Sequence, residues 1–297
     1  MTNKIRIVLW GYDKSAEMKL EALLSLPGVI VAAVVVPVNR DKKRVNAIKA
    51  IALRHKIKVY EPQFLRNNNA FRKAIASLHP DIFIVDSYTK LIPKSLFELP
   101  RSGAYNFHPG RLPEYRGAHV LNWAIINGEE KIALTVHLLN EEFDSGDIVF
   151  AEDIKISFLD DINTVFDKVC KAGVLLLTRL IAAVRDDNLK LFPQTGLKVK
   201  AYHLRSPDDG SIDWNRNSMQ IYNLIRALLP PWPCAFFTYK GRKIRIREAY
   251  PVNFSADVEP GVVVGVGRNG FCVSSADNVL LIKRADKMNF TAGEKLN

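Results

Sequence analysis

The first half of the chain alternates between short apolar runs and longer amphipathic segments. The runs "KIRIVLWG", "VIVAAVVVPV", "IKVYEP" and "DIFIVDSYT" have the length and the β-branched content of buried strands. Between them, "SAEMKLEALLSL", "RVNAIKAIALRHK" and "NNNAFRKAIASLH" repeat apolar residues at helical spacing. This alternation predicts an α/β fold with a doubly wound, mostly parallel sheet, which binds ligands at the carboxyl ends of its strands.

The last third of the chain has a different pattern. After the long amphipathic segment "INTVFDKVCKAGVLLLTRLIAAV", and beyond Lys200, only one further helix is indicated, "SMQIYNLIRAL". It precedes short apolar runs separated by Gly, Asn and Asp turns, namely "AFFTYKG", "KIRIREAYPV", "GVVVGVG", "GFCVSSA" and "NVLLIKRAD". We therefore expect two domains, with a small β-barrel as the second.

Composition narrows the function classes. Hydrophobic residues make up 48% and charged residues 25%, as in a globular protein. No apolar run reaches the ~18 residues of a spanning helix, and the start "MTNKIRIVLWG" lacks the layout of a signal peptide, so we expect a cytoplasmic protein without a membrane partner. Cys170, Cys234 and Cys272 lack metal-ligand spacing, so no metal is expected. The net charge of +11 favours anionic partners without naming one.

The first strand-to-helix turn, "WGYDKSAE", carries Gly11 but no GxGxxG. A dinucleotide pyrophosphate needs that glycine-rich turn. The sequence therefore argues against NAD binding.

The stretch "GAYNFHPGRLPEYRGAHVLNW" carries the candidate chemistry. Asn106 and His108 alternate with Tyr105 and Phe107 at the end of an expected strand, so both polar side chains project from the same face. An amide there is suited to stabilising an oxyanion, and an imidazole to taking a proton from an attacking amine.

Further along, "NEEFDSGDIV" places Asp144 before a turn, where its carboxylate can orient a histidine ring. Together the three residues suit acyl transfer to an amine. Each residue alone also has a structural interpretation: a strand-end Asn or His is commonly a loop residue, and DSG is a common turn. The other histidines are interpreted as structural, at helix ends, in a strand or in the linker: His55, His79, His119, His137 and His203.

The combined string is more specific. "NFHPGRLPEYRG", "LNWAIINGE" and "FDSGDIV" together resemble the folate-dependent formyltransferase family, which includes methionyl-tRNA formyltransferase, glycinamide ribonucleotide transformylase and the amino-sugar formyltransferases. The matching positions are Asn106, His108, Pro109, Leu112, Pro113, Arg116, Gly117, Asp144 and Gly146. "DGSIDW", "IRALLPPWPCAFF" and "KIRIREA" resemble the carboxyl-terminal barrel of the methionyl-tRNA and aminoarabinose branches, so the resemblance covers nearly the whole chain. Because the purine-synthesis members lack this barrel, that assignment falls behind.

The resemblance implies a Rossmann-like formyltransferase core over residues 1–200 and an OB-like β-barrel over residues 201–297. It implies catalytic roles for Asn106, His108 and Asp144, with 10-formyltetrahydrofolate as the formyl donor. By the same resemblance the pterin would lie along "DSYTKLIP", with contacts from Asp86, Tyr88, Leu91 and Ile92. Arg116 and Gly117 would contact the acceptor.

The acceptor stays open at this stage, and a nucleotide-linked amino sugar is favoured. "RSPDDGSIDW" and "RGAHVLNWAIINGE" look closest to the aminoarabinose-type and nucleotide-sugar enzymes. The basic loop "NRDKKR" at Asn39 to Arg44 would suit tRNA, but the tRNA enzymes tend to have a longer, glycine-rich basic insertion there. Gly110 and Arg111 depart from the residues that many members have, which also bears on the acceptor.

Four alternatives remain. Two are enzymes, namely methionyl-tRNA formyltransferase and a formyltransferase for hydroxyornithine-type siderophore precursors. The other two are a binding or regulatory module that has kept the fold without the reaction, and a nucleic-acid-binding protein, which would bind tRNA tightly and with strong salt dependence. The oligomeric state is not indicated by the sequence.

Overall fold

The computed structural model describes residues 4–38, 42–195 and 199–296. The chain divides into two compact units that each contain several stretches of sequence. The first comprises Met1–Gly117, Ala133–Ile154 and Asp167–Ala201, and the second comprises Ala118–Ile132, Lys155–Phe166 and Tyr202–Asn297. A boundary at residues 200 and 201 stays a prediction.

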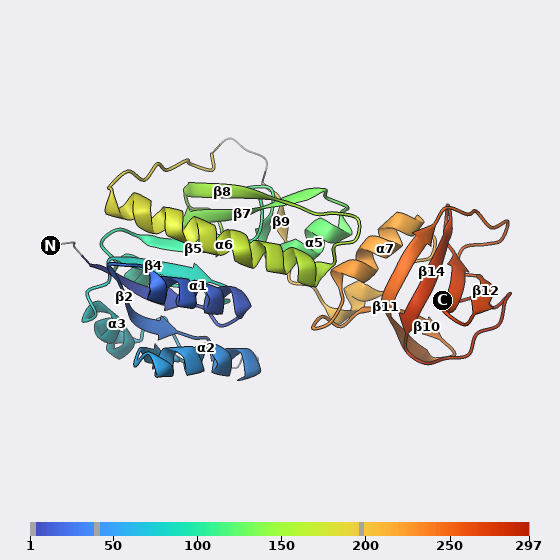
Figure 1. The fold of residues 1–297 in the computed structure, drawn as a ribbon, viewed down its shortest axis with the longest axis horizontal. Coiled ribbons are helices and arrows are strands. Elements are labelled where there is room, and N and C mark those ends of the chain that lie inside the picture. The colour runs from blue at the N-terminus through green and yellow to red at the C-terminus, as the bar shows by residue number, and fades with distance from the viewer. Residues whose placement is uncertain (1–3, 39–41, 196–198, 297) are drawn as a thin grey trace. The chain divides into compact units, whose positions relative to one another are not determined.

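A seven-stranded sheet forms the centre of the first unit, in the order β3-β2-β1-β4-β5-β7-β8 (Figure 1). The strands are β1 (Ile5–Trp10), β2 (Val29–Val35), β3 (Lys58–Tyr60), β4 (Ile82–Asp86), β5 (Ala104–His108), β7 (Lys131–Leu138) and β8 (Ile148–Lys155). The first five in chain order run parallel, whereas β7 pairs antiparallel with β5. The predicted α/β class with a mostly parallel sheet is therefore confirmed.

Helices cover both faces of this sheet, which is why β4 is buried along its whole length. They are α1 (Lys14–Ser25), α2 (Lys42–Arg54), α3 (Asn69–Ala76), α4 (Lys94–Phe97) and α6 (Ile162–Arg185). Helix α1 begins after Asp13, whose side chain accepts hydrogen bonds from the backbone amides of Ser15 and Ala16. On one face Phe71 and Ile75 of α3 pack around Trp10, and Figure 1 shows α1 and α6 in front of the sheet on the other face.

The second unit is built on a five-stranded antiparallel sheet in the order β10-β11-β14-β13-β12. Its strands are β10 (Ala235–Tyr239), β11 (Arg242–Val252), β12 (Val263–Gly267), β13 (Gly270–Ser274) and β14 (Val279–Ala285). Helix α7 (Ser218–Ala227) packs on β11 and against α5 (Val120–Ile126). The expected smaller β domain is confirmed. Within residues 199–296 the two outer strands β10 and β12 are not paired with each other.

The short elements are the two-stranded pair of β6 (Arg116–Gly117) with β9 (Ala201–Tyr202) and the turn of 3-10 helix η1 (Pro207–Gly210). In the described part of the chain, no helix combines the length and the apolar character that spanning a membrane requires.

Candidate active site

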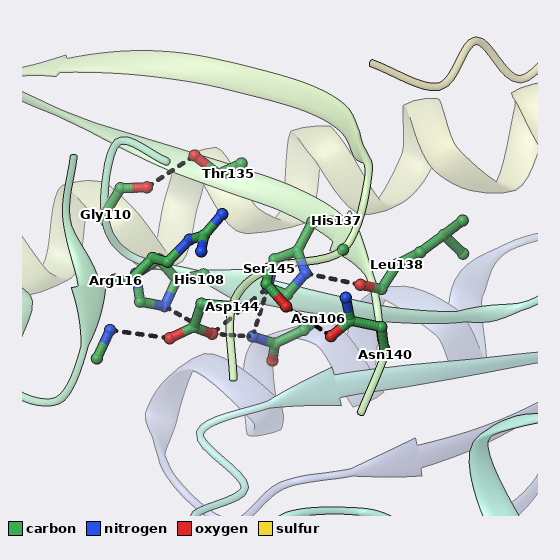
Figure 2. Close-up of polar contacts among 12 residues, drawn as sticks. Asn106, His108, Gly110, Arg116, Thr135, His137, Leu138, Asn140, Asp144 and Ser145 are labelled. Carbon is green, nitrogen blue, oxygen red and sulfur yellow. Dashed lines mark hydrogen bonds and ion pairs between the residues drawn. The ribbon is translucent and has the colours of Figure 1, made fainter. Parts of the chain in front are cut away.

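Two of the three predicted catalytic side chains lie at the carboxyl end of β5. Asn106 and His108 lie on the same face of this strand, and the antiparallel register sets Asn106 opposite His137 of β7. His108 is buried, with 4% of its surface exposed. The carboxyl end of a central strand thus presents an amide and an imidazole side by side (Figure 2).

Asp144 reaches the same point from the loop that follows β7. Its backbone has φ +54°, a left-handed conformation that Asp tolerates better than most residues. Two positions later a side chain at Gly146 would collide with the carbonyl of Leu138, so the turn requires glycine there. The "DSG" turn therefore exists to bring the loop close to β7 and the carboxylate inward.

The three predicted side chains form one cluster. Asp144 Oδ1 is 3.4 Å from His108 Nδ1 and 3.4 Å from Asn106 Nδ2 (Figure 2). Asp144 Oδ2 accepts a 3.0 Å hydrogen bond from the amide of Gly117. Gly117, predicted as an acceptor contact, thus holds the carboxylate through its backbone. Residues separated by as many as 38 positions are brought together here.

The imidazole of His108 is held from both sides. Its Nε2 lies 2.6 Å from the carbonyl oxygen of Tyr115, so Nε2–H donates to that carbonyl and Nδ1 faces Asp144. Burial lowers the pKa of His108, while the Asp144 charge and the hydrogen bond to Tyr115 act in the opposite direction. The ring is therefore neutral at physiological pH, with Nδ1 unprotonated and available as a base.

The carboxylate of Asp144 is strongly favoured in its charged form. Burial by itself would raise its pKa, but His108, the neighbouring His137 and the amide of Gly117 lower that pKa to about 2. Asp144 therefore carries a negative charge throughout the pH range in which His108 titrates.

His137 belongs to the cluster although its sequence context indicated only a strand residue. Its Nδ1–H donates to the carbonyl of Leu138 at 2.8 Å, which leaves Nε2 to accept a 3.1 Å hydrogen bond from Asn106 Nδ2. This contact fixes which end of the Asn106 amide carries the N–H groups. The alternation of β7 and its pairing with β5 are the only signals that place His137 here.

Arg116 does not present a free guanidinium. Its Nε and Nη2 donate to Gln194 Oε1 at 3.1 and 2.7 Å. The amide nitrogen of Gln194 in turn donates to the carbonyls of Asp144 and Gly146, at 3.0 and 2.7 Å. Arg116 therefore supports the Asp144 loop through Gln194, and its acceptor contact stays a prediction.

The segment predicted to contact folate begins at Asp86, the last residue of β4, and continues into the following loop. Ile92 and Tyr88 are buried and Leu91 is half-buried. The Asp86 carboxylate is occupied by Lys19 Nζ at 2.6 Å, whereas the hydroxyl of Tyr88 is buried without a hydrogen-bond partner in the described part of the chain. Of the four predicted folate contacts, Tyr88 therefore has a polar group left to satisfy.

Gly110, one of the departures from the family pattern, lies against the His108 ring. An added Cβ would come within 2.6 Å of His108 Nε2 and 2.5 Å of the Tyr115 carbonyl. The Gly110 carbonyl is fixed by a 2.7 Å hydrogen bond from Thr135 Oγ1, so the loop has little freedom to withdraw (Figure 2).

We expect Gly110→Ala to reduce kcat about tenfold or more, because the methyl group forces the imidazole away from Tyr115 and small displacements of a reacting group are costly. Gly265→Ala is the matched control, since a Cβ there meets nothing within 4 Å. Steady-state kinetics of both variants check this, and an unchanged kcat for Gly110→Ala would contradict the placement of His108.

Two further expectations concern other regions. The basic segment Asn39 to Arg44 is only partly visible, because residues 39–41 lie outside the described residues. Within the described ranges 4–38, 42–195 and 199–296, no group of three or more His, Cys, Asp or Glu side chains is placed to hold a metal ion.

Comparison with known proteins identifies the family. The sequence profile described as formyl transferase matches residues 16–181, and the one described as formyl transferase, C-terminal domain, matches residues 205–294. Methionyl-tRNA formyltransferase of Alkaliphilus oremlandii is 30% identical over 283 residues, which cover 94% of this chain and 91% of the relative. The bifunctional polymyxin resistance protein of Wigglesworthia glossinidia brevipalpis is 31% identical over 263 residues, covering 88% of this chain and 40% of the relative.

A solved structure of similar fold is the N-formyltransferase from Helicobacter canadensis in complex with folinic acid and dTDP-3-aminofucose. It has a TM-score of 0.71 at 18% identity and covers 94% of this chain and 99% of that chain. Both profiles and the sequence relatives agree, and the chain therefore belongs to the formyl transferase family of enzymes.

Proposed function

We propose that this enzyme transfers a formyl group from 10-formyltetrahydrofolate to a primary amine on a nucleotide-linked amino sugar. The observation that carries the transfer reaction is the cluster of Asn106, His108 and Asp144 at the end of β5. An N–H donor, a neutral imidazole and a charged carboxylate are what the attack of an amine on an acyl carbon requires.

The proposed order of events follows from the contacts. As the amine nitrogen bonds to the formyl carbon, Asn106 Nδ2 exchanges its 3.4 Å contact with Asp144 for the developing oxyanion and keeps its bond to His137. His108 Nδ1 takes the amine proton, and the resulting imidazolium donates to Asp144 on one side and to the Tyr115 carbonyl on the other. His108 then returns this proton to the nitrogen that leaves the formyl carbon.

Several observations fit 10-formyltetrahydrofolate as the donor. When bound, it supplies an activated formyl carbon. Leu91 offers partly exposed apolar surface, and the Tyr88 hydroxyl, which is buried without a partner among the described residues, can donate to a ring acceptor. Two solved neighbours support this choice, since one is in complex with folinic acid and another contains 5-N-formyl-tetrahydrofolate together with dTDP.

The connection between β2 and α2 supports a sugar acceptor over tRNA. Strand β2 ends at Val35 and α2 begins at Lys42, so there is no room for the long basic insertion that tends to mark the tRNA branch. Solved neighbours that cover nearly all of this chain include sugar N-formyltransferases. A nucleoside diphosphate also matches the positive net charge of +11.

Methionyl-tRNA is the second candidate acceptor. It is favoured by the sequence relatives, several of which are methionyl-tRNA formyltransferases at 30 to 32% identity. It too is polyanionic, so charge alone does not separate the two acceptors.

The test is a turnover assay that follows release of tetrahydrofolate from 10-formyltetrahydrofolate. Amino-sugar nucleotides are supplied as a panel beside charged initiator methionyl-tRNA. Turnover with an amino sugar is the expected result, and formylation of the tRNA alone would replace the proposed acceptor with the second candidate. Turnover of hydroxyornithine alone would overturn both.

A further inference from the structure

A fully buried lysine lies behind the catalytic strand. Lys19 of α1 has no exposed surface, and its Nζ is 2.6 Å from Asp86 Oδ2 and 2.9 Å from Ser15 Oγ. Burying an ammonium group is costly unless it is paired and hydrogen-bonded. The burial of Lys19 is therefore explained by these contacts, which a solvated surface lysine would not need.

The surroundings of the ammonium group are shaped to hold it. Nζ lies 4.7 Å from the centroid of the Phe107 ring, within the range of a cation–π contact. On the other side, α6 has Gly173, where any Cβ would collide with Nζ. Elements α1, α6, β4 and β5 thus meet at this one charge.

The register of the sheet connects this charge to the reacting groups. Asp86, the last residue of β4, pairs with Phe107 of β5. Phe107 stands between Asn106 and His108 and projects from the opposite face, because successive strand residues alternate. Contacts that hold the Phe107 ring therefore act on β5 directly behind Asn106 and His108, the two side chains that face Asp144.

We propose that Lys19, paired with Asp86, is a positioning residue of the formyl transfer site: from behind β5 it fixes Phe107 and so sets the orientation of Asn106 and His108. The proposal rests on the proposed reaction for its kinetic test only. Under this proposal, helix α1 contributes to catalysis through Lys19 although it does not contact any substrate.

The electrostatic surroundings show what removing the ammonium group would do. Lys19 faces two carboxylates, Asp86 and the N-cap residue Asp13, together with the buried thiol of Cys170 on α6. Burial, and after it the Asp86 charge, raises the pKa of Asp13 to about 6, and burial raises that of Cys170 to about 12. Without Lys19 the two carboxylates repel each other in a site of low polarity, and one of them must take up a proton or draw in water.

Lys19→Met tests the proposal, since it keeps the length of the side chain and removes the charge. We expect kcat to fall about ten- to hundredfold with the KM of the formyl donor little changed, because small displacements of reacting groups affect the chemical step. The defect should grow as the pH rises, because protonation of a carboxylate at low pH relieves the repulsion. Lys14→Met is the matched control, for it removes a lysine of the same helix whose ion pair with Asp167 is exposed.

A second readout needs no substrate. Histidine side-chain resonances in ¹⁵N NMR report the environment of His108 and His137, and we expect them to shift in Lys19→Met and to stay in place in Lys14→Met. If the wild-type enzyme turned over no acceptor, the proposed function would fail while the NMR comparison still decided the role of Lys19.

A double variant keeps the test decisive if Lys19→Met does not fold. Lys19→Met with Asp86→Asn removes both charges of the ion pair, so the repulsion between Asp86 and Asp13 is removed as well. It should fold, keep a lowered kcat and shifted histidine resonances, and lose the growth of the defect with pH. A folded single or double variant with the kcat and the histidine resonances of the wild type would overturn the proposal.

Discussion

Asn106→Ala is expected to lower kcat by about 10²–10³-fold, the cost of removing one donor from an oxyanion site. The KM values should change little, because the negative charge on oxygen develops only as the amine attacks. The substitution also leaves His137 Nε2 without its 3.1 Å donor. Because kcat rather than KM is expected to change, raising the substrate concentration should not restore the activity. Single-turnover kinetics with saturating donor and acceptor give this number directly.

Asn188→Ala is the control for that experiment, since its side chain is exposed in the same unit. It should retain the wild-type kcat. A kcat for Asn106→Ala within about twofold of wild type would remove the amide from the proposed mechanism.

Asp144→Asn is expected to have an effect of similar or greater size, about 10²–10⁴-fold in kcat, as when a carboxylate that orients a histidine is neutralised. The pH profile carries further information. Burial lowers the pKa of His108 and the Asp144 charge raises it, so removing that charge lowers the pKa further. Because the proposed mechanism uses the neutral imidazole of His108, the acid limb of kcat/KM should move to lower pH in the variant.

The control for this charge change is Glu142→Gln, an exposed carboxylate in the same loop. Its pH profile should coincide with that of the wild type. An acid limb that moved to higher pH in Asp144→Asn would mean that a group other than His108 is the base.

Much of the first unit follows from local pattern. The apolar runs that became β1, β4 and the second half of β2 are buried on both faces, and continuous apolar stretches of that kind have few other solutions. Strand β8 gave a weaker signal, because it carries three consecutive exposed residues, Ala151 to Asp153, near the edge of the sheet. The antiparallel pairing of β7 with β5 makes the sheet mixed, which the alternation of strands and helices alone does not indicate.

The same distinction, between residues in a local motif and residues placed by long-range pairing, applies to the candidate site. Asn106, His108 and Asp144 were visible because each stands in a short motif, and the structure brings them together. His137 and Gln194 have no such motif, and their positions depend on strand register and on contacts across 31 and 48 to 50 residues. Long-range pairing of this kind leaves no trace in a local window of sequence.

Lys19 is an intermediate case. The buried residues Ala16, Leu20 and Leu23 mark the apolar side of α1, and position 19 falls on that side by the i, i+3, i+4 rule. A lysine at such a position indicates a buried counter-charge. The sequence alone does not reveal that Asp86 supplies it, because the pairing joins residues 67 positions apart.

Gln194 has a consequence for protein engineering. Its amide spans the carbonyls of Asp144 and Gly146, and next to it Phe192 forms a backbone bridge with Ile148 of β8. The segment after α6 is therefore part of the candidate active site, although its sequence resembles a linker between domains. A chimera that combined the first domain with a foreign second domain would need its junction after Gln194, since a junction at the end of α6 would remove the residue whose hydrogen bonds hold the Asp144 loop.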